Sequence, residues 1–441
     1  MTRTRKTFDG SSRTRSPERG DSSAGLAWIG GKCLCTALIL IAFSIFPPAV
    51  CRAEQDVPCL DQASREAAIV LISPDSRVVY QRNGHRPYVP ASTLKLLTAL
   101  TAIHHLGLTF RFRTAFYMDS SDNLKIKGYG DPMLTSEVWQ EIADELSHRF
   151  RSINDLVLDI SYFSQDLRIP GTGRSANPYD APPGALCANF STVFFRRDRQ
   201  GRIVTSEAQT PITAFARGKI RSLGLKQGRY TICHDAAEAA RYAGALLACF
   251  LRRKGTEIRG TIRPGLVTPE DKRVFTWVSP FTLKDVIQKM MAFSSNFVAN
   301  QICITTGARV YGPPGTLDKG MRVLRDYANK ELHLKDITLV EGSGVSRKNR
   351  LTVLDMATVL DRFRPYRHLL RSEGCSFYKT GTLKGIRTRA GYFEPAPGRI
   401  WRFVVFLNHG ETEMNAIMAC MERNFVGRDR QTARNPRRQS Q

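Results

Sequence analysis

The alternation of apolar and polar positions predicts β-strands near both ends of the chain. Two short runs, residues 67–72 (AAIVLI) and 77–82 (RVVYQR), are joined by Ser-Pro-Asp-Ser, which is good turn chemistry for a hairpin. Near the other end, a helix-like segment at 411–425 follows three further strand-like runs, at 374–381, 387–394 and 399–408. Strands at both ends with helices between them predict one antiparallel sheet assembled from the two ends of the chain.

The middle of the chain divides into two regions by the same criterion. Residues 110–275 alternate strand-like runs with loops rich in Gly and Pro, which predicts a mostly β domain inserted into the core. From Leu283 the apolar spacing becomes helical, over 283–293, 296–307 and 316–330. The predicted organisation is a basic leader with an export signal or anchor (1–53), a core (54–109 and 276–424), the insertion (110–275) and a basic disordered tail (425–441).

A helix buried round most of its circumference is predicted to start near Ser92 and to end at Gly107. Lys95 lies in its apolar run, three residues after Ser92, so the two side chains share a helix face. Burial lowers the pKa of a lysine, and a neutral amine can take a hydroxyl proton. The pair is therefore a candidate nucleophile and base. The string alone is weak, because it recurs at Ser376 and Lys379 in a predicted strand, where the two side chains face apart.

Two further motifs carry groups that could handle a peptide. Lys379-Thr380-Gly381-Thr382 lies on a predicted strand, where a cation, two hydroxyls and a glycine suit an extended peptide with a free carboxylate. Ser294-Ser295-Asn296 offers a hydroxyl and an amide between two predicted helices. Two competing strings fit structural roles better: Ser121-Asp122-Asn123 at a predicted hairpin tip, and Tyr327-Ala328-Asn329 at the end of an amphipathic helix.

Charge and the leader bear on the compartment. The net charge of +25 would suit nucleic acid, an anionic surface or a polyanionic matrix. Residues 33–50 form 18 uncharged residues after a basic lead, which is the pattern of an export signal. Cleavage after Ala53 and an uncleaved membrane anchor both stay open, because this length is near the spanning minimum. Either way we expect the rest of the chain to be periplasmic or otherwise extracytoplasmic, which argues against nucleic acid as a partner.

The ten cysteines fit an oxidising compartment but name no pairing. Seven of them would follow a cut after Ala53, so at least one stays unpaired within the chain. One or two disulfides are expected, with the partners open. We expect no metal and no cofactor, because HExxH is absent and the adjacent His104 and His105 cannot both face one point on a helix.

In the order SxxK, SxN, KTG, the motifs resemble the penicillin-recognising serine enzymes. They are most similar to the D-Ala-D-Ala carboxypeptidase/endopeptidase family of low-molecular-mass penicillin-binding proteins. Supporting stretches are GYGDPMLTSE, YDAPPGALCANFS and VEGSGVSRKNRLT, within a likeness over most of residues 66–410. The resemblance implies an α+β, β-lactamase/transpeptidase-like fold with a mostly β inserted domain. It also implies a serine peptidase that cleaves peptidoglycan peptides and that β-lactams inhibit covalently.

The resemblance implies roles on the nucleophile side of the site. Ser92 would be the acylated nucleophile and Lys95 its base. Ser294 would pass a proton to the leaving D-alanine nitrogen, and Asn296 would bind the amide backbone of the substrate.

It implies further roles on the strand side. Lys379 would orient that proton relay, while Thr380 and Thr382 hold the terminal carboxylate beside Gly381. The oxyanion would lie between the backbone N–H groups of the nucleophile and of Thr382, as in other acyl-transfer sites. Asp131, in the predicted insertion, would contact the D-centre of a peptide side chain.

Two positions depart from the family pattern, and two other functions stay open. Ser295 replaces the usual acidic residue of SDN, and Glu341 stands where the family has Asp; neither touches the proposed chemistry. A β-lactamase shares the fold and the motifs, but no ExxxN string of the kind that supplies a deacylating Glu occurs between Asn296 and Lys379. A non-catalytic wall-binding or penicillin-sensor protein would have no need of a buried lysine beside a serine.

Overall fold

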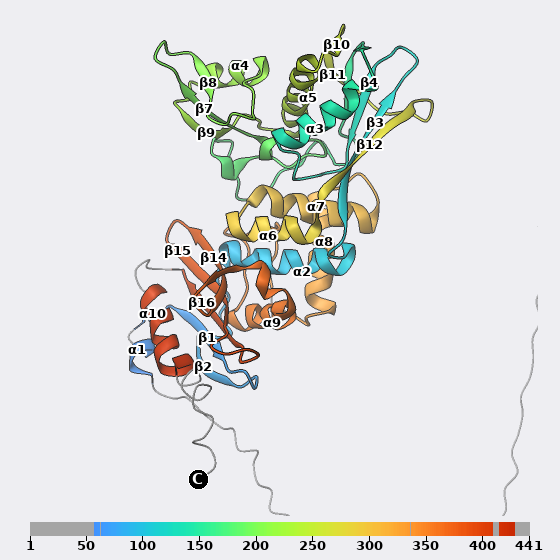
Figure 1. Ribbon diagram of the computed structural model, residues 1–441. Helices are drawn as coiled ribbons and strands as arrows, with labels where there is room; N and C mark the ends of the chain where they lie inside the picture. Colours follow the sequence, from blue (N-terminus) through green and yellow to red (C-terminus); the bar gives the residue numbers. More distant parts are fainter. Residues whose placement is uncertain (1–56, 62, 336, 409–413, 428–441) are drawn as a thin grey trace, which may run out of the picture. The chain divides into compact units, whose positions relative to one another are not determined.

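The computed structural model describes residues 57–61, 63–335, 337–408 and 414–427. Six strands form an antiparallel sheet in the order β13-β14-β15-β16-β1-β2. Their bounds are β1 (Ala68–Ile72), β2 (Val78–Arg82), β13 (Arg371–Glu373), β14 (Ser376–Leu383), β15 (Ile386–Phe393) and β16 (Trp401–Leu407). Because β1 pairs with β16, strands from the two ends of the described chain lie side by side, as predicted (Figure 1).

The central strands of this sheet pack against a different core on each face. Ile69 and Leu71 of β1 point to the face covered by α1 (Pro58–Asp61), α10 (Met414–Met421) and the π-helical turn Glu422–Val426. Ala68 and Val70 alternate with them and join the core of α2 (Lys95–Leu106) and α9 (Val353–Phe363). This period-two pattern is why continuous apolar runs, buried on both faces, form the centre of the sheet.

The predicted tail begins too early, at residue 425. Phe425 and Val426 are buried in the turn after α10, and the Phe425 ring lies 6.3 Å from that of Trp401. These two apolar residues extend the buried stripe of the helix, so the polar segment can start only after them. The remaining predicted tail from 428, like the predicted export segment 33–50, lies outside the described residues.

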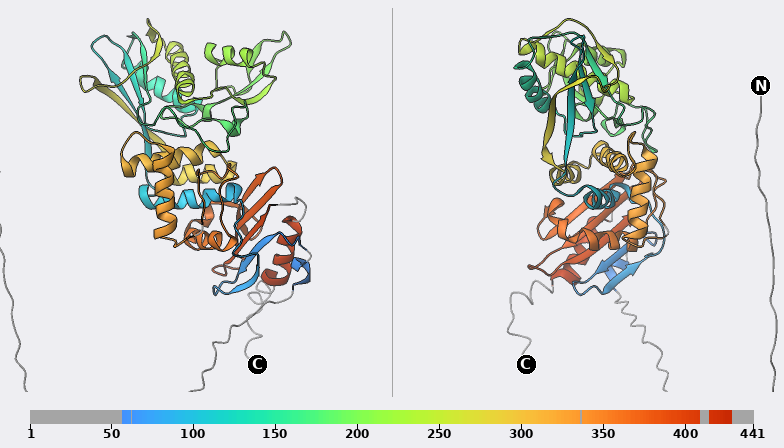
Figure 2. Two further views of the ribbon diagram at one scale, coloured as in Figure 1. Left: turned by 180° about the vertical axis from the view of Figure 1, so that it is seen from behind. Right: turned by 90° about the vertical axis from the view of Figure 1, so that its right-hand side faces the viewer.

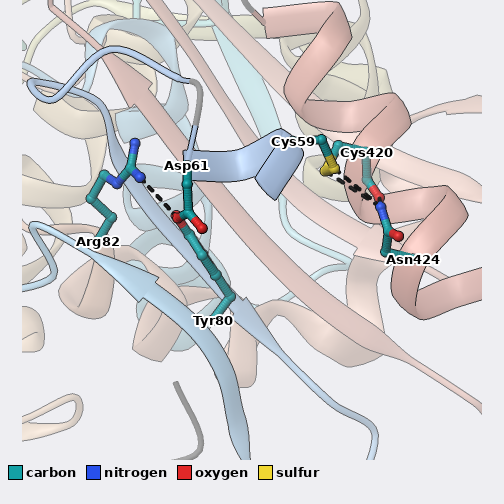
Figure 3. Close-up of a disulfide and its surroundings, with 6 residues drawn as sticks. All are labelled: Cys59, Asp61, Tyr80, Arg82, Cys420 and Asn424. Carbon is teal, nitrogen blue, oxygen red and sulfur yellow. Dashed lines mark hydrogen bonds and ion pairs between the residues drawn. A yellow bond between two sulfur atoms is a disulfide. The ribbon is translucent and has the colours of Figure 1, made fainter. Parts of the chain in front are cut away.

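A disulfide joins the first helix to the last one. Cys59 of α1 and Cys420 of α10 are bonded, with 6.1 Å between their Cα atoms. Asn424 donates hydrogen bonds to Cys59 Sγ (3.1 Å) and to the Cys420 carbonyl (2.9 Å), as Figure 3 shows. The Asp61 carboxylate accepts from Arg82 of β2, also at 3.1 Å. The start of the described chain is thus fixed to the sheet face opposite α2, and the pairing left open by the sequence is resolved for these two cysteines.

The helical layer surrounds α2. This helix contacts α6 (Leu283–Phe293), α7 (Asn296–Tyr311), α8 (Leu317–Lys330) and α9. Residues 95–102 are therefore all buried, which explains the apolar run that predicted a buried helix. A 3₁₀ turn, η1 (Ala91–Leu94), precedes α2, and Gly107 (φ 78°) ends it.

The region between α2 and α6 contains the predicted strands and three helices that were not predicted. Five strands form one mixed sheet in the order β11-β6-β4-β3-β12, with bounds β3 (Arg111–Met118), β4 (Leu124–Gly128), β6 (Leu156–Asp159), β11 (Ile262–Pro264) and β12 (Lys272–Thr282). Smaller sheets consist of β7 (Thr192–Arg197), β8 (Ile203–Thr205) and β9 (Gly228–Thr231), and of β5 (Ser152–Ile153) and β10 (Glu257–Ile258). The helices are α3 (Ser136–Ser147), α4 (Ala214–Ser222) and α5 (Ala236–Arg253), and the short 3₁₀ turns of this region are η2 (Pro178–Asp180) and η3 (Asn189–Ser191). Another 3₁₀ turn, η4 (Arg364–Leu369), lies outside this region and follows α9 directly.

Two details of this region differ from expectation. The Ala-rich α5 packs on β6 and β11, so the region is more helical than "mostly β" suggests. The sequence contains the pattern that predicts this helix, an N-cap residue followed by an alanine-rich run. Asp235 is that N-cap and accepts from the Glu238 N–H (2.8 Å). The predicted boundary between residues 275 and 276 falls within β12, which pairs with β3 and runs on to Thr282, the N-cap of α6.

In both views of Figure 2, the helical layer lies between the six-stranded sheet and the region that runs from β3 to β12 in the sequence. Among the residues that the structure describes, no helix has both the length and the apolar character needed to cross a bilayer.

Candidate active site

Ser92 lies in η1, immediately before α2. Ala91 has a positive φ of 46°, and its carbonyl is approached so closely by Gly344 that a side chain at Gly344 would clash with it. Thr93 Oγ1 donates to the Pro90 carbonyl (2.6 Å), which fixes the turn from inside. The backbone is thus held at the point where the chain enters α2, and the Ser92 side chain is partly exposed.

Lys95 is the first residue of α2 and is completely buried. Its Nζ donates to three acceptors: Ser92 Oγ (2.9 Å), Asn296 Oδ1 (2.8 Å) and the Ser343 carbonyl (2.7 Å). Burial places the pKa of Lys95 well below its ordinary value, and the nearby charge of Lys379 lowers it further, while Glu341 opposes both. The neutral form of the Lys95 amine is therefore more favoured in this site than it is in water.

The Ser294-Ser295-Asn296 motif forms the junction of α6 and α7. Ser294 adopts the left-handed conformation (φ 54°, ψ 34°), which reverses the chain between the two helices. Ser295 Oγ caps α7 by accepting from the Val298 N–H (3.2 Å), so the residue that departs from the family pattern has a local capping role. Asn296 follows as the buried first residue of α7, with its amide oxygen on the Lys95 amine.

The Lys379–Thr382 motif lies on β14, as predicted. Lys379 Nζ donates to Ser294 Oγ (2.9 Å) and to the Thr380 carbonyl (2.7 Å), and burial lowers the pKa of Lys379 to about 8. Thr380 and Thr382 are exposed. Gly381 packs so closely that an added Cβ would lie 2.8 Å from the Ser92 backbone nitrogen and would clash with Thr388 Oγ1. Only glycine allows β14 to approach Ser92 this closely.

One edge of β14 is open beside Ser92. β13 pairs with Ser376–Tyr378 only, so no described strand pairs with that edge of β14 from Lys379 onward. Unpaired backbone N–H and C=O groups along an edge can add an extended peptide as one more strand.

Glu341 belongs to the site, and its role there was not predicted from the sequence. Its fully buried carboxylate accepts from the N–H and Oγ of Ser343 (2.7 and 2.6 Å), the Gly344 N–H (2.7 Å) and Asn349 Nδ2 (2.7 Å). The loop so ordered supplies the Ser343 carbonyl that accepts from Lys95. The acidic residue in the EGSG string was visible, but its contact with the lysine passes through a backbone group and leaves no trace in a sequence pattern.

Asp131 makes no hydrogen bond through its side chain to any of these groups. Its side chain is 1% exposed, its Oδ1 accepts from the Met133 N–H (2.8 Å), and its Oδ2 has no hydrogen-bond partner among the described residues. Burial raises the pKa of Asp131 to about 6. The predicted contact of Asp131 with the D-centre of a peptide side chain stays a prediction.

The competing strings have the structural roles expected of them. Asp119, next to Ser121-Asp122-Asn123, accepts from the N–H groups of Ser121 (3.0 Å) and Asn123 (2.9 Å), which closes the turn between β3 and β4. Tyr327 and Ala328 are buried in α8. Ser376 and Lys379 lie on one strand, and the lysine bonds to Ser294 rather than to Ser376.

A serine hydroxyl bonded to a buried lysine, with a second serine–lysine pair and an open strand edge beside it, is the arrangement of a serine acyl-transfer enzyme on a β-lactamase/transpeptidase-like α+β fold. Residues 49–372 match the D-Ala-D-Ala carboxypeptidase 3 (S13) family, and the chain belongs to that family. It is a serine-type D-Ala-D-Ala carboxypeptidase. The match ends before β14, so the strand with Lys379 is assigned to the site by geometry.

Relatives and solved structures agree with this family. The chain is 24% identical over 440 residues to the D-alanyl-D-alanine carboxypeptidase DacB of Haemophilus influenzae, covering 84% of this chain and 91% of that protein. It is 23% identical over 438 residues to a D-alanyl-D-alanine carboxypeptidase of Actinomadura sp., covering 80% and 79%. The crystal structure of penicillin binding protein 4 from H. influenzae superposes with a TM-score of 0.67 at 22% identity, covering 82% of this chain and 96% of that one. A complex of the same protein with a β-lactam gives a TM-score of 0.65 at 21% identity, covering 85% and 99%.

Proposed function

We propose that Ser92 is the nucleophile and Lys95 the general base of a peptidase that cleaves the D-Ala-D-Ala bond of peptidoglycan stem peptides through an acyl-enzyme. The observation that carries this proposal is the set of three acceptors around Lys95 Nζ. The Ser343 carbonyl and the Asn296 amide oxygen can accept hydrogen bonds but cannot donate them. A neutral amine gives its two hydrogens to these two groups, which leaves its lone pair directed at Ser92 Oγ.

The reaction then follows from that lone pair. Ser92 Oγ attacks the carbonyl carbon of the penultimate D-alanine while its proton moves to Lys95 Nζ. The oxyanion forms between the backbone N–H groups of Ser92 and Thr382, where each donor contributes roughly 2.7–4 kcal/mol in comparable sites. The C–N bond breaks, the leaving D-alanine nitrogen takes a proton through Ser294, and water then hydrolyses the ester.

Lys379 and its neighbours are proposed to hold the substrate. The Lys379 ammonium donates to Ser294 Oγ (2.9 Å), so it orients the hydroxyl that relays the proton. The exposed hydroxyls of Thr380 and Thr382 would bind the terminal carboxylate, and the open edge of β14 would pair with the peptide backbone. Asn296 would donate its Nδ2 hydrogens to the substrate amide.

The same centre would open a β-lactam, since its strained amide presents a carbonyl and a carboxylate in place of those of D-Ala-D-Ala. The H. influenzae relative forms a complex with a β-lactam.

We also propose an endopeptidase activity on cross-linked peptides. The protein would work outside the cytoplasm after export by residues 33–50, which are either cleaved or retained as an anchor. We further propose that the chain consists of a core and an inserted domain, and that the inserted domain is the region between α2 and α6.

The test combines acylation and turnover. Purified protein is treated with a fluorescent penicillin and analysed by mass spectrometry, and D-alanine release from a stem pentapeptide is measured in parallel. One acyl group on Ser92 is expected, with loss of both signals in Ser92→Ala. The matched control is Ser376→Ala, which removes the serine of the second SxxK string and should keep both. Labelling that persists in Ser92→Ala would overturn the assignment, and penicillin turnover faster than peptide turnover would favour a β-lactamase instead.

A further inference from the structure

A basic cavity with aromatic walls lies at the far end of α7, the helix that begins with Asn296. It has a volume of about 500 Å³ and lies between the β3–β4 strands, the loop after β6 and the turn after α7. A smaller cavity of about 170 Å³ continues it. The two share four lining residues, Arg113, Tyr129, Tyr162 and Arg309, which we call the Arg–Tyr cluster.

The cations of this cluster are not neutralised. The Arg113 guanidinium lies over the Tyr129 ring, 4.5 Å from its centroid, and the Tyr129 and Tyr162 rings are 5.0 Å apart. Neither Arg113 nor Arg309 makes an ion pair with any residue in the described part of the chain. No lining residue of either cavity, all of them described, is acidic. Two guanidinium groups therefore line a cavity to which no lining residue contributes a carboxylate.

Lys127 and Arg111, the other cations of the cavities, already have partners. Lys127 Nζ lies 3.0 Å from the Asp159 carboxylate, and Arg111 donates to the carbonyl groups of Ser279 and Pro280. Because Lys127 and Arg111 are already bonded within the fold, Arg113 and Arg309 are the cations available to a ligand.

A buried hydroxyl without a partner gives an independent indication. Thr305 of α7 lines the smaller cavity, is 1% exposed, and its Oγ1 makes no hydrogen bond to a described residue. Its neighbour Thr306 instead donates to the Ile302 carbonyl one turn back (2.8 Å), as helical threonines often do. A buried polar atom left unsatisfied in a protein requires an explanation, and a ligand in the adjoining cavity supplies one.

We propose that the Arg–Tyr cluster is a second binding site, for an oxyanion carried on a sugar or peptide, and that its ligand is a carboxylate of the peptidoglycan strand. Two arginines bind a carboxylate or a phosphate through paired N–H donors, and Thr305 adds a hydroxyl. The tyrosine faces offer flat surfaces for the attached ring or backbone. The identity of the polymer rests on the proposed function; the oxyanion chemistry does not.

The position of this site suits a polymer. Ala308 at the cavity lies twelve positions after Asn296 along α7, which corresponds to about 18 Å at 1.5 Å per residue. One strand held at the cluster would keep its other peptides at high local concentration near Ser92, without any new contact at the catalytic centre.

Isothermal titration calorimetry tests the site directly. The full chain is first saturated with penicillin, and mass spectrometry records whether Ser92 is acylated. It is then titrated with a muramyl tetrapeptide, with the same compound amidated at its carboxylates, and with inorganic phosphate. The variants are Arg113→Gln with Arg309→Gln, and both positions changed to Lys. Arg199→Gln is the matched control, because it removes one charge from the exposed turn between β7 and β8.

We expect the muramyl tetrapeptide to bind, and the amidated compound and the double Gln variant to lose at least about tenfold in affinity, as loss of charge-assisted bonds implies. The Lys variants should be intermediate, and Arg199→Gln unchanged. Binding of phosphate but not of the tetrapeptide would keep the oxyanion site and assign it to a phosphate-bearing polymer. Equal affinity in the double Gln variant, an equal loss in Arg199→Gln, or no binding of either anion would overturn the proposal. Failure of Ser92 acylation would instead count against the proposed function alone.

Discussion

Replacing Glu341 by Gln tests how a carboxylate outside the proposed substrate contacts controls Lys95, the proposed general base. Oε2 accepts from Ser343 (2.7 and 2.6 Å) and Asn300 (3.3 Å), and Oε1 accepts from Gly344 (2.7 Å), Asn349 (2.7 Å) and Ser346 (3.2 Å). The amide NH₂ of Gln must replace one of these oxygens, and it cannot accept. The three hydrogen bonds to that oxygen are lost, and two of them are 2.7 Å or shorter whichever oxygen is replaced. Counting only these two charge-assisted bonds, each contributes roughly 1.5–3 kcal/mol. We therefore expect the free energy of unfolding to fall by about 3–6 kcal/mol.

The same substitution should change the pH dependence of acylation. Lys95 acts as a base only when neutral, and Glu341 is the group that raises the pKa of Lys95 against burial and Lys379. Without the Glu341 charge the pKa of Lys95 falls further, so the acid limb of the acylation rate moves to lower pH. The plateau should also fall, because the Ser343 carbonyl is no longer held against Nζ.

The assay is the rate of Ser92 acylation by a fluorescent penicillin between pH 4 and pH 9, with urea denaturation of the same preparations. Glu341→Asp keeps the charge and installs the residue usual in the family that the sequence resembles, so it should lose less stability and leave the acid limb in place. A Gln variant with wild-type stability and an unmoved acid limb would refute the assigned part of Glu341.

Three further predictions follow from single side chains. The pKa of Asp131 is raised from 3.8 to about 6, so the folded state holds a proton that the unfolded state releases, and stability should fall as pH rises from about 4 to 6. Asp131→Asn should abolish this loss of up to about 3 kcal/mol, as measured by denaturation at pH 4 and pH 7. An equal difference between the two pH values in the variant would contradict the prediction. Because the pKa of Lys379 is about 8, kcat/KM for a peptide with a free carboxylate should fall as pH rises through 8, whereas Lys379→Arg should keep a flat profile there. Gly381→Ala should slow acylation at least tenfold because its Cβ meets Ser92 N at 2.8 Å, while Gly218→Ala, with nothing within 4 Å of the new Cβ, should match the wild type; equal rates in both would exclude the steric argument.

Local patterns predicted what depends on neighbours in the sequence. The Ser92–Lys95 contact follows from three-residue helical spacing, and the strands of the six-stranded sheet follow from runs of apolar residues buried on both faces. The helix α5 could have been predicted too, from Asp235, Glu238 and the alanines after them, but the Gly- and Pro-rich surroundings favoured strands.

Long-range and backbone contacts could not be predicted in this way. Cys59 and Cys420 are 361 residues apart, and nothing in their spacing distinguishes them from the other cysteines. The acceptors that complete the surroundings of Lys95 come from Asn296 and from the Ser343 carbonyl, 201 and 248 residues away. The family resemblance implied that Asp131 contacts a peptide side chain, and its burial, which depends on tertiary packing, could not be predicted from a motif.

The Cys59–Cys420 bond has a consequence for handling the protein. It closes residues 59–420 into a covalent ring, so a protease that nicks any loop within that ring leaves one connected molecule. Fragments would separate on a denaturing gel only after reduction. Limited digestion run with and without a thiol would thus distinguish cleavage inside the ring from trimming of the segments beyond it.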